Sequence, residues 1–129
     1  MIGGKEKTAM TSLERVQAAT GYKEPDRVPL FLGLTMYGAK ELGLSIQEYF
    51  SKAEYVVDGQ LRMLAKYRLD CLNPLFYAAM ETEAFGGEVV WFEDGPPNVG
   101  ELLVKTPDDI SSLQVPVVKE TPCLVGRFW

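Results

Sequence analysis

Two carboxylates, Glu81 and Glu83, follow an Asn73-Pro74 pair and precede two adjacent glycines. At the rim of a pocket, carboxylates could take part in acid–base chemistry. In the first turn of a short helix, the same carboxylates are stabilised by the helix dipole and need no chemical role. Both interpretations stay open for Glu81, whereas the helical interpretation is preferred for Glu83.

The sequence contains no histidine, and its two cysteines, Cys71 and Cys123, lie far apart. It can therefore form no Cys-His or Ser-His catalytic pair and no histidine metal site. The cysteine spacing matches no metal-ligand motif. Cys71 lies in the apolar stretch "LDCLN", which is typical of a small buried side chain. Carboxylates, tyrosines and backbone groups remain as candidates for chemistry.

Length and composition predict one soluble globular domain, because the chain has 129 residues, 47% hydrophobic and 24% charged. The net charge of -5 predicts no binding to nucleic acid or anionic lipid. No apolar stretch is long enough to span a membrane, and the opening "MIGGKEKTAM" lacks the apolar centre of a signal peptide. We therefore expect a cytoplasmic protein, with residues 1–9 as a disordered, leader-like or tag-like segment.

The elements that must position any site begin with helices. Four stretches carry helix-start signals, and the longest helix is expected to follow the third. Its residues Val57, Leu61, Leu64 and Ala65 recur at helical spacing and predict one buried face. Gly21 is expected just beyond the end of the first helix. The signals are Thr11 with Glu14, Ser45 with Glu48, Ser51 with Glu54, and Thr106 with Pro107.

Strands are expected between these helices. Residues 27–34 ("RVPLFLGL") and 69–75 ("LDCLNPL") are almost continuously apolar, which is typical of strands buried on both faces. Because a helical stretch separates them, they predict a βαβ unit with a parallel sheet. Residues 88–92 and 101–104 flank a Gly-Pro-Pro-Asn turn and predict a hairpin or two short edge strands.

These stretches resemble the uroporphyrinogen decarboxylase superfamily. "TSLERVQAATGYKEPDRVPLFLG" is similar to its first helix, its "PDR-P" turn and its first strand. "YRLDCLNPLF" and "ETEAFGGEVVWFEDGPP" resemble its second strand and the segment that follows. The likeness runs from about residue 10 to residue 113 and implies an α/β fold, a (β/α)8 TIM barrel. Since a complete barrel needs about 250 residues, residues 10–129 are expected to be the truncated N-terminal part of such a barrel.

Two departures favour one branch of this superfamily. Decarboxylases carry an arginine-rich segment after the first strand, where this chain reads "GLTMYGAKELG" and offers no bidentate partner to an anionic tetrapyrrole. They also place an aspartate after the second strand, where this chain has Tyr77 and Ala78. The sequence looks closer to corrinoid-dependent methyltransferases, which share a Glu-(any)-Glu-Ala-(Leu/Phe)-Gly run.

That resemblance implies a zinc ion that binds a thiol acceptor of the coenzyme M type, or a pterin acceptor, and a corrinoid (cobalamin) protein as methyl donor. The implied zinc ligands are a His-(any)-Cys pair and a later cysteine, which this chain lacks. We therefore expect no catalytic residue, no metal ligand and no bound cofactor in this chain, and no activity from it alone. The alternatives are a decarboxylase and a non-catalytic αβ binding or interaction module.

Four residues are candidates for pocket lining because each lies at the end of a predicted strand or in the segment after it: Met36, Asn73, Tyr77 and Glu81. Each of them is open to an alternative interpretation as ordinary packing or, for Glu81, as part of a helix turn. An incomplete parallel sheet would also expose an unpaired, apolar edge. We therefore expect a homo-oligomer, one route to which is exchange of residues 115–129 between copies.

Overall fold

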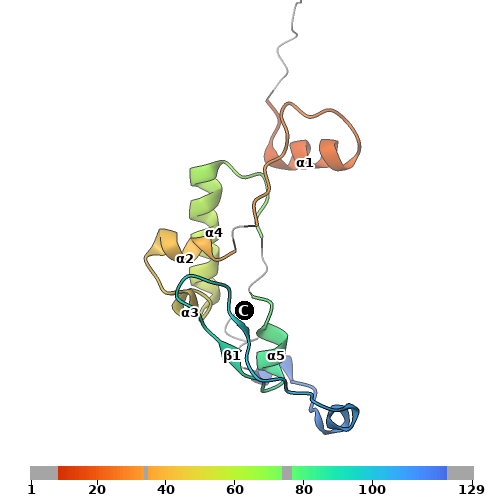
Figure 1. The fold of residues 1–129 in the computed structure, drawn as a ribbon. Coiled ribbons are helices and arrows are strands. Elements are labelled where there is room, and N and C mark those ends of the chain that lie inside the picture. Colours follow the sequence, from red (N-terminus) through yellow and green to blue (C-terminus); the bar gives the residue numbers. More distant parts are fainter. Residues whose placement is uncertain (1–8, 34, 74–76, 122–129) are drawn as a thin grey trace, which may run out of the picture.

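The computed structural model of the chain describes residues 9–33, 35–73 and 77–121. Figure 1 shows these residues in an elongated arrangement, with α1 apart at one end and the C-terminal turns at the other. The helices are α1 (Ser12–Thr20), α2 (Tyr37–Leu42), α3 (Ile46–Tyr49), α4 (Ala53–Tyr67) and α5 (Met80–Ala84). Strands β1 (Val89–Val90) and β2 (Asn98–Val99) are followed by the 3-10 helices η1 (Pro107–Ser112) and η2 (Val118–Glu120).

Three of the four predicted helix starts are confirmed. Thr11 forms a capping box with Glu14, and Gly21 is the C-cap of α1. Ser45 caps α3 in the same way, and Thr106 begins η1, which is a 3-10 helix. The start predicted at Ser51 is wrong: α4 is preceded by Lys52 at the N-cap position, without a side-chain cap. The Ser51 hydroxyl instead donates to the Glu48 carbonyl at 2.7 Å, at the end of α3.

The two predicted parallel strands, residues 27–34 and 69–75, do not form strands in the described part of the chain. They nevertheless run side by side (Figure 1), joined by one backbone hydrogen bond of 2.8 Å from Asp70 N–H to the Leu30 carbonyl. Pro29 has no N–H to add to a ladder. A parallel pair without further neighbours lacks the flanking strands and helices that stabilise such sheets. The described residues therefore form no barrel.

The predicted hairpin forms, with its first strand within the predicted range and its second strand at a different place. Val89 pairs with Val99 and Val90 pairs with Asn98 in an antiparallel arrangement. The segment predicted as the second strand, residues 101–104, does not pair. Pairing occurs immediately after the two prolines of the turn, which cannot donate to a ladder themselves.

The hydrophobic core lies where α2, α3, α4 and the hairpin meet. Tyr49 and Phe50 are fully buried. The Phe50 ring packs against Tyr77 with centroids 5.3 Å apart, and Tyr77 contacts Trp91 edge-on at 5.2 Å. Such tilted and edge-on contacts are the favoured geometries of aromatic pairs. Aromatic residues from three separate stretches of the chain therefore hold this core together.

The buried face of α4 differs from the predicted one. Leu61 is 49% exposed, and Val57 and Ala65 are also exposed. The face that α4 buries consists of Val56, Gly59, Gln60 and Met63. The reason is a close approach at Gly59, where an added Cβ would lie 2.7 Å from a Tyr49 ring carbon and 2.9 Å from the Gly38 Cα. Gly59 thus turns its own side of α4 toward α2.

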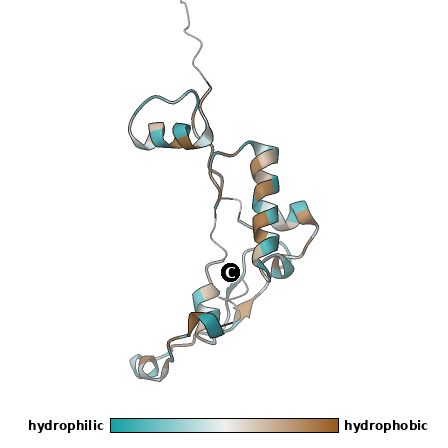
Figure 2. Cartoon of the chain, turned by 180° about the vertical axis from the view of Figure 1, so that it is seen from behind, coloured by the Kyte–Doolittle hydropathy of each residue, from teal (hydrophilic) through white to brown (hydrophobic). Residues whose placement is uncertain are grey.

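Figure 2 colours parts of α4 as hydrophobic, and on this helix Val57 is 56% exposed and Leu61 is 49% exposed. Among the described residues, no helix combines the length and the apolar character that a membrane crossing requires.

Candidate functional site

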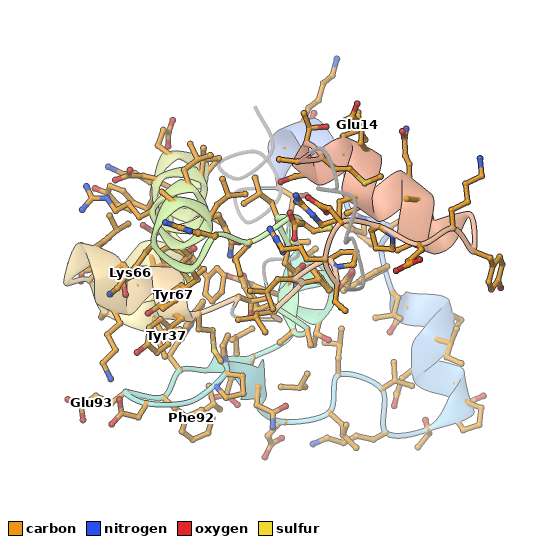
Figure 3. All side chains as sticks on the ribbon, turned by 90° about the horizontal axis from the view of Figure 1, so that it is seen from above. Glu14, Tyr37, Lys66, Tyr67, Phe92 and Glu93 are labelled. Atoms are coloured by element: carbon orange, nitrogen blue, oxygen red, sulfur yellow. The ribbon has the colours of Figure 1, made fainter. Side chains whose placement is uncertain are left out.

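An open pocket of about 410 Å³ lies between the start of α2 and the loop after β1. Its apolar wall comes from Met36, Tyr37 and Ile46, with Ala39 and Leu44. Its polar rim consists of Thr35, Lys40, Glu93 and Asp94. Figure 3 shows Tyr37 and Glu93 on these two elements. Because residues 35–37 follow the first predicted strand, the pocket lies where a barrel of this type would carry its active site.

Tyr37 is held in place by contacts between α2 and α4 (Figure 3). The Tyr67 ring meets the Tyr37 ring edge-on, with centroids 6.4 Å apart. Glu41 accepts a hydrogen bond from Lys66 at 2.7 Å and another from the Tyr67 hydroxyl at 3.3 Å. The Lys66 ammonium lowers the pKa of Glu41, and Glu41 in turn raises the pKa of Lys66. This ion pair and the ring contact link α2 to α4 beside the pocket wall.

The charge at the pocket rim is predominantly negative. Glu93 and Asp94 supply two carboxylates, and Lys40 is the single cationic side chain among the described lining residues. The Lys40 ammonium lies 5.8 Å from the centroid of the Tyr37 ring, a cation–π geometry that partly satisfies its charge. The rim therefore favours neutral or cationic groups over anionic ones.

Of the four predicted pocket residues, the structure places Met36 in this pocket. Tyr77 is 4% exposed within the core, and its hydroxyl donates to a Glu83 carboxylate oxygen. Asn73 is half-buried in the segment between α4 and α5, and Glu81 is exposed. The structure does not bring these three residues to the described pocket lining, and their roles in binding stay predictions.

Glu81 and Glu83 lie in the first turn of α5, as the helical interpretation predicts. Cys71 is half-buried rather than fully buried, and Cys123 lies outside the described residues.

The sequence interpretation missed Glu93 and Asp94. Both precede a Gly-Pro-Pro turn. Polar residues are common beside turns, so their presence there suggested no role in binding. Glu93 and Asp94 line the same pocket as Met36 although they are more than 50 positions away in the sequence. No local pattern encodes that long-range arrangement, so only the structure reveals it.

A second cluster of charges joins α1 to the two extended segments. Arg15 donates to Asp26 at 2.6 Å and to Asp70 at 2.5 Å. Arg27 donates to both Asp70 oxygens, at 2.7 and 3.0 Å. Asp70 also accepts from the Ser12 hydroxyl at 2.9 Å and from the Leu30 N–H at 2.8 Å. We call Arg15, Asp26, Arg27 and Asp70 the ion cluster.

The centre of the ion cluster, Arg15 and Asp70, is buried, whereas Arg27 is about half exposed. The Asp70 side chain has no exposed surface, and burial raises the pKa of this carboxyl. Hydrogen bonds from Leu30, Ser12, Arg27 and Arg15 outweigh burial and lower the Asp70 pKa to about 2. The cluster lies near the beginnings of the two predicted strands. In a βα barrel that end is opposite the active site, so the cluster serves stability.

These features describe an α/β chain with a pocket after its first predicted strand and a structural ion cluster before it. A family model described as uroporphyrinogen decarboxylase (URO-D) matches residues 11–125. The chain belongs to the uroporphyrinogen decarboxylase family. The match confirms the superfamily resemblance and indicates a TIM-barrel-type fold for the family domain. No curated protein and no solved structure gives a significant match.

The described residues contain no group of three His, Cys, Asp or Glu side chains that could hold a metal ion. This part of the chain therefore does not fit the zinc that the methyltransferase resemblance implies.

Proposed function

We propose that this chain is the N-terminal part of a corrinoid-dependent methyltransferase of the uroporphyrinogen decarboxylase family. In this proposal a methyl group passes from a methylated corrinoid protein to a thiol of the coenzyme M type or to a pterin. The catalytic zinc site lies outside this chain, and the chain alone is inactive. The observation that carries the choice of branch is the negatively charged rim formed by Glu93 and Asp94.

The physical reason is the charge of the two possible ring systems. A porphyrinogen carries several carboxylates, which need arginine or lysine partners to leave water. The described pocket offers Lys40 alone against two carboxylates of its own. The corrin ring of cobalamin instead carries mostly neutral amides, which an acidic rim does not repel. Met36 and Tyr37 would then form an apolar wall against the face of a corrin.

A binding comparison tests this choice. The 129-residue chain is dialysed against methylcobalamin and, separately, against coproporphyrin, and bound tetrapyrrole is measured by absorbance. The proposal departs here from the sequence-based expectation that this chain binds no cofactor, because the pocket wall is made of its own residues. It expects saturable binding of methylcobalamin and none of coproporphyrin. Neutralising the rim in the variant Glu93→Gln/Asp94→Asn should leave cobalamin binding unchanged and raise coproporphyrin binding only weakly, because it removes the repulsion but leaves Lys40 as the one cationic partner among the described lining residues.

Tight binding of coproporphyrin to the unchanged chain would contradict the proposal and favour the decarboxylase, the activity after which the family is named. Binding of neither compound would favour a non-catalytic αβ module. A matched control is Asp58→Asn, which neutralises an exposed carboxylate on α4 that does not line the pocket. Its binding of both compounds should equal that of the unchanged chain.

A further inference from the structure

The pocket beside α2 already holds one cation, which the chain itself supplies. The Lys40 ammonium lies 5.8 Å from the centroid of the Tyr37 ring, within the distance at which an aromatic face attracts a cation. Both residues line the pocket. Lys40 is exposed and belongs to no ion pair in the part of the chain that the structure describes. Its ammonium can therefore move into water and leave the ring face to another cation.

The pocket rim also carries two carboxylates that the chain does not neutralise. Glu93 and Asp94 are exposed, and within the described ranges neither side chain makes an ion pair. Lys40 lines the same pocket, yet its ammonium lies over the Tyr37 ring instead of pairing with either carboxylate. The rim therefore keeps an excess of negative charge, which attracts cations from solution.

The apolar lining decides which kind of cation fits. Met36, Ala39, Leu44 and Ile46 form this lining, and they supply none of the oxygen ligands that a hard metal ion needs when it leaves water. An alkylated ammonium spreads its charge over carbon-bound hydrogens, so it contacts an aromatic ring and apolar side chains together. The pocket of about 410 Å³ lies within the range of small-molecule sites, about 300–1,000 Å³.

We propose that this pocket binds small quaternary ammonium compounds, with the charged group held by the Tyr37 ring and attracted by the carboxylates of Glu93 and Asp94. Lys40 covers the ring when no ligand is bound and is displaced by the ligand. This inference concerns the pocket on which the proposed function rests, but it requires no corrinoid. Binding of an ammonium compound and binding of methylcobalamin are measured separately, so the failure of one is distinguishable from the failure of the other.

A nuclear magnetic resonance titration of the isotopically labelled 129-residue chain tests the inference. Choline chloride is compared with dimethylbutanol, the uncharged isostere in which carbon replaces the nitrogen, and with sodium chloride at equal ionic strength. We expect choline to bind at least about fivefold more tightly than the isostere and to shift the amide signals of Tyr37, Lys40 and Glu93. Sodium chloride should not produce these shifts.

Variants separate the contributions of the ring, the carboxylates and the lysine. Tyr37→Leu keeps an apolar side chain, and Glu93→Gln/Asp94→Asn keeps the size of the rim. Each should lower the affinity for choline by about threefold or more and leave the affinity for the isostere unchanged. Lys40→Met should raise the affinity for choline, because the competing cation is gone, and a misfolded chain cannot produce this gain.

The matched control is Asp58→Asn, which neutralises an exposed carboxylate on α4 outside the pocket lining. It should bind choline as the unchanged chain does, and circular dichroism checks that every variant retains its helices. Equal affinities for choline and its isostere would overturn the inference, because the pocket would then select shape and not charge. No binding of choline would overturn it too, even if methylcobalamin binds. So would a loss in Asp58→Asn as large as that in Glu93→Gln/Asp94→Asn, because the net charge of the chain would then explain the attraction.

Discussion

Replacing Asp70 with asparagine removes one negative charge from the centre of the ion cluster and keeps the size of the side chain. Asp70 accepts hydrogen bonds from the side chains of Arg15, Arg27 and Ser12 and from the Leu30 N–H. An asparagine has one oxygen to accept these bonds, and its amide nitrogen would face donors. The substitution therefore breaks the cluster without creating a cavity.

The magnitude follows from what happens to each arginine. Arg15 is 6% exposed and cannot turn to water, but it keeps Asp26 at 2.6 and 2.8 Å. Arg27 is about half exposed and can be solvated. Breaking a buried ion pair costs about 3–5 kcal/mol, and the remaining partner of Arg15 places the expected cost near 3 kcal/mol. The exposed pair Asp58–Arg62 provides a matched control, since Asp58→Asn should cost less than about 0.5 kcal/mol.

Urea unfolding followed by circular dichroism measures the loss in the free energy of unfolding. Hydrogen exchange of the α1 amides shows where the loss occurs, because the ion cluster attaches this helix to the extended segments. We expect α1 to exchange much faster in Asp70→Asn and at the original rate in Asp58→Asn. Equal unfolding midpoints for Asp70→Asn and the unchanged chain would refute the argument that the cluster stabilises this part of the fold.

Four further predictions concern pH, packing and metal binding. The unchanged chain should be more stable than Asp70→Asn by a constant free energy above pH 3.8, the ordinary pKa of an aspartate, and this difference should disappear as the pH falls through about 2. The reason is that folding lowers the pKa of Asp70, so only its ionised form stabilises the folded state. Urea titrations at several pH values measure the difference. Gly59→Ala should lower the unfolding free energy by about 1–3 kcal/mol, because the new methyl group meets the Tyr49 ring; an unchanged urea midpoint would contradict this close approach. Met63→Ala should lower the unfolding free energy by about 2–5 kcal/mol, whereas Leu61→Ala should lower it much less because Leu61 is half-exposed. A larger loss for Leu61→Ala in the same urea assay would contradict the buried face assigned to α4. Dialysis against zinc followed by elemental analysis should find less than one ion per chain, and stoichiometric zinc would show a ligand set that the described residues lack.

Local signals in the sequence predicted local structure well. The capping box of Thr11 and the stop at Gly21 lie within a few residues of the backbone groups that they satisfy, so the bounds of α1 followed from sequence. The prediction of strands at 27–34 and 69–75 was wrong, because a parallel strand depends on neighbours that lie elsewhere in the chain. The prediction of the buried face of α4 was wrong for a related reason. Gly59 lies at the close contact with Tyr49 and Gly38, but it lacks a side chain and contributes nothing to a hydrophobic pattern.

In the candidate site, too, local features could be predicted from the sequence and long-range ones could not. Met36 lies in the pocket lining, and its position shortly after a predicted strand is one that lines pockets in βα proteins; its role in binding stays a prediction. Tyr77 follows the second segment in the same way, yet its ring is drawn into the aromatic core by Phe50 and Trp91. Glu93 reaches the pocket through the hairpin, and no spacing rule connects it with residue 36.

The ion cluster also sets the order in which the chain can fold. Arg15 and Asp70 are 55 positions apart, whereas α2 and α4 are close in sequence and pack against each other directly. Closing a longer loop costs more entropy, so α2 and α4 should come together before α1 docks. During synthesis α1 leaves the ribosome before Asp70 has been made, so Arg15 can pair early with Asp26, which is 11 positions away, and only later with Asp70. Arg15 is the one residue that α1 buries in the folded chain. Before it docks, the helix therefore exposes no buried hydrophobic side chain to water.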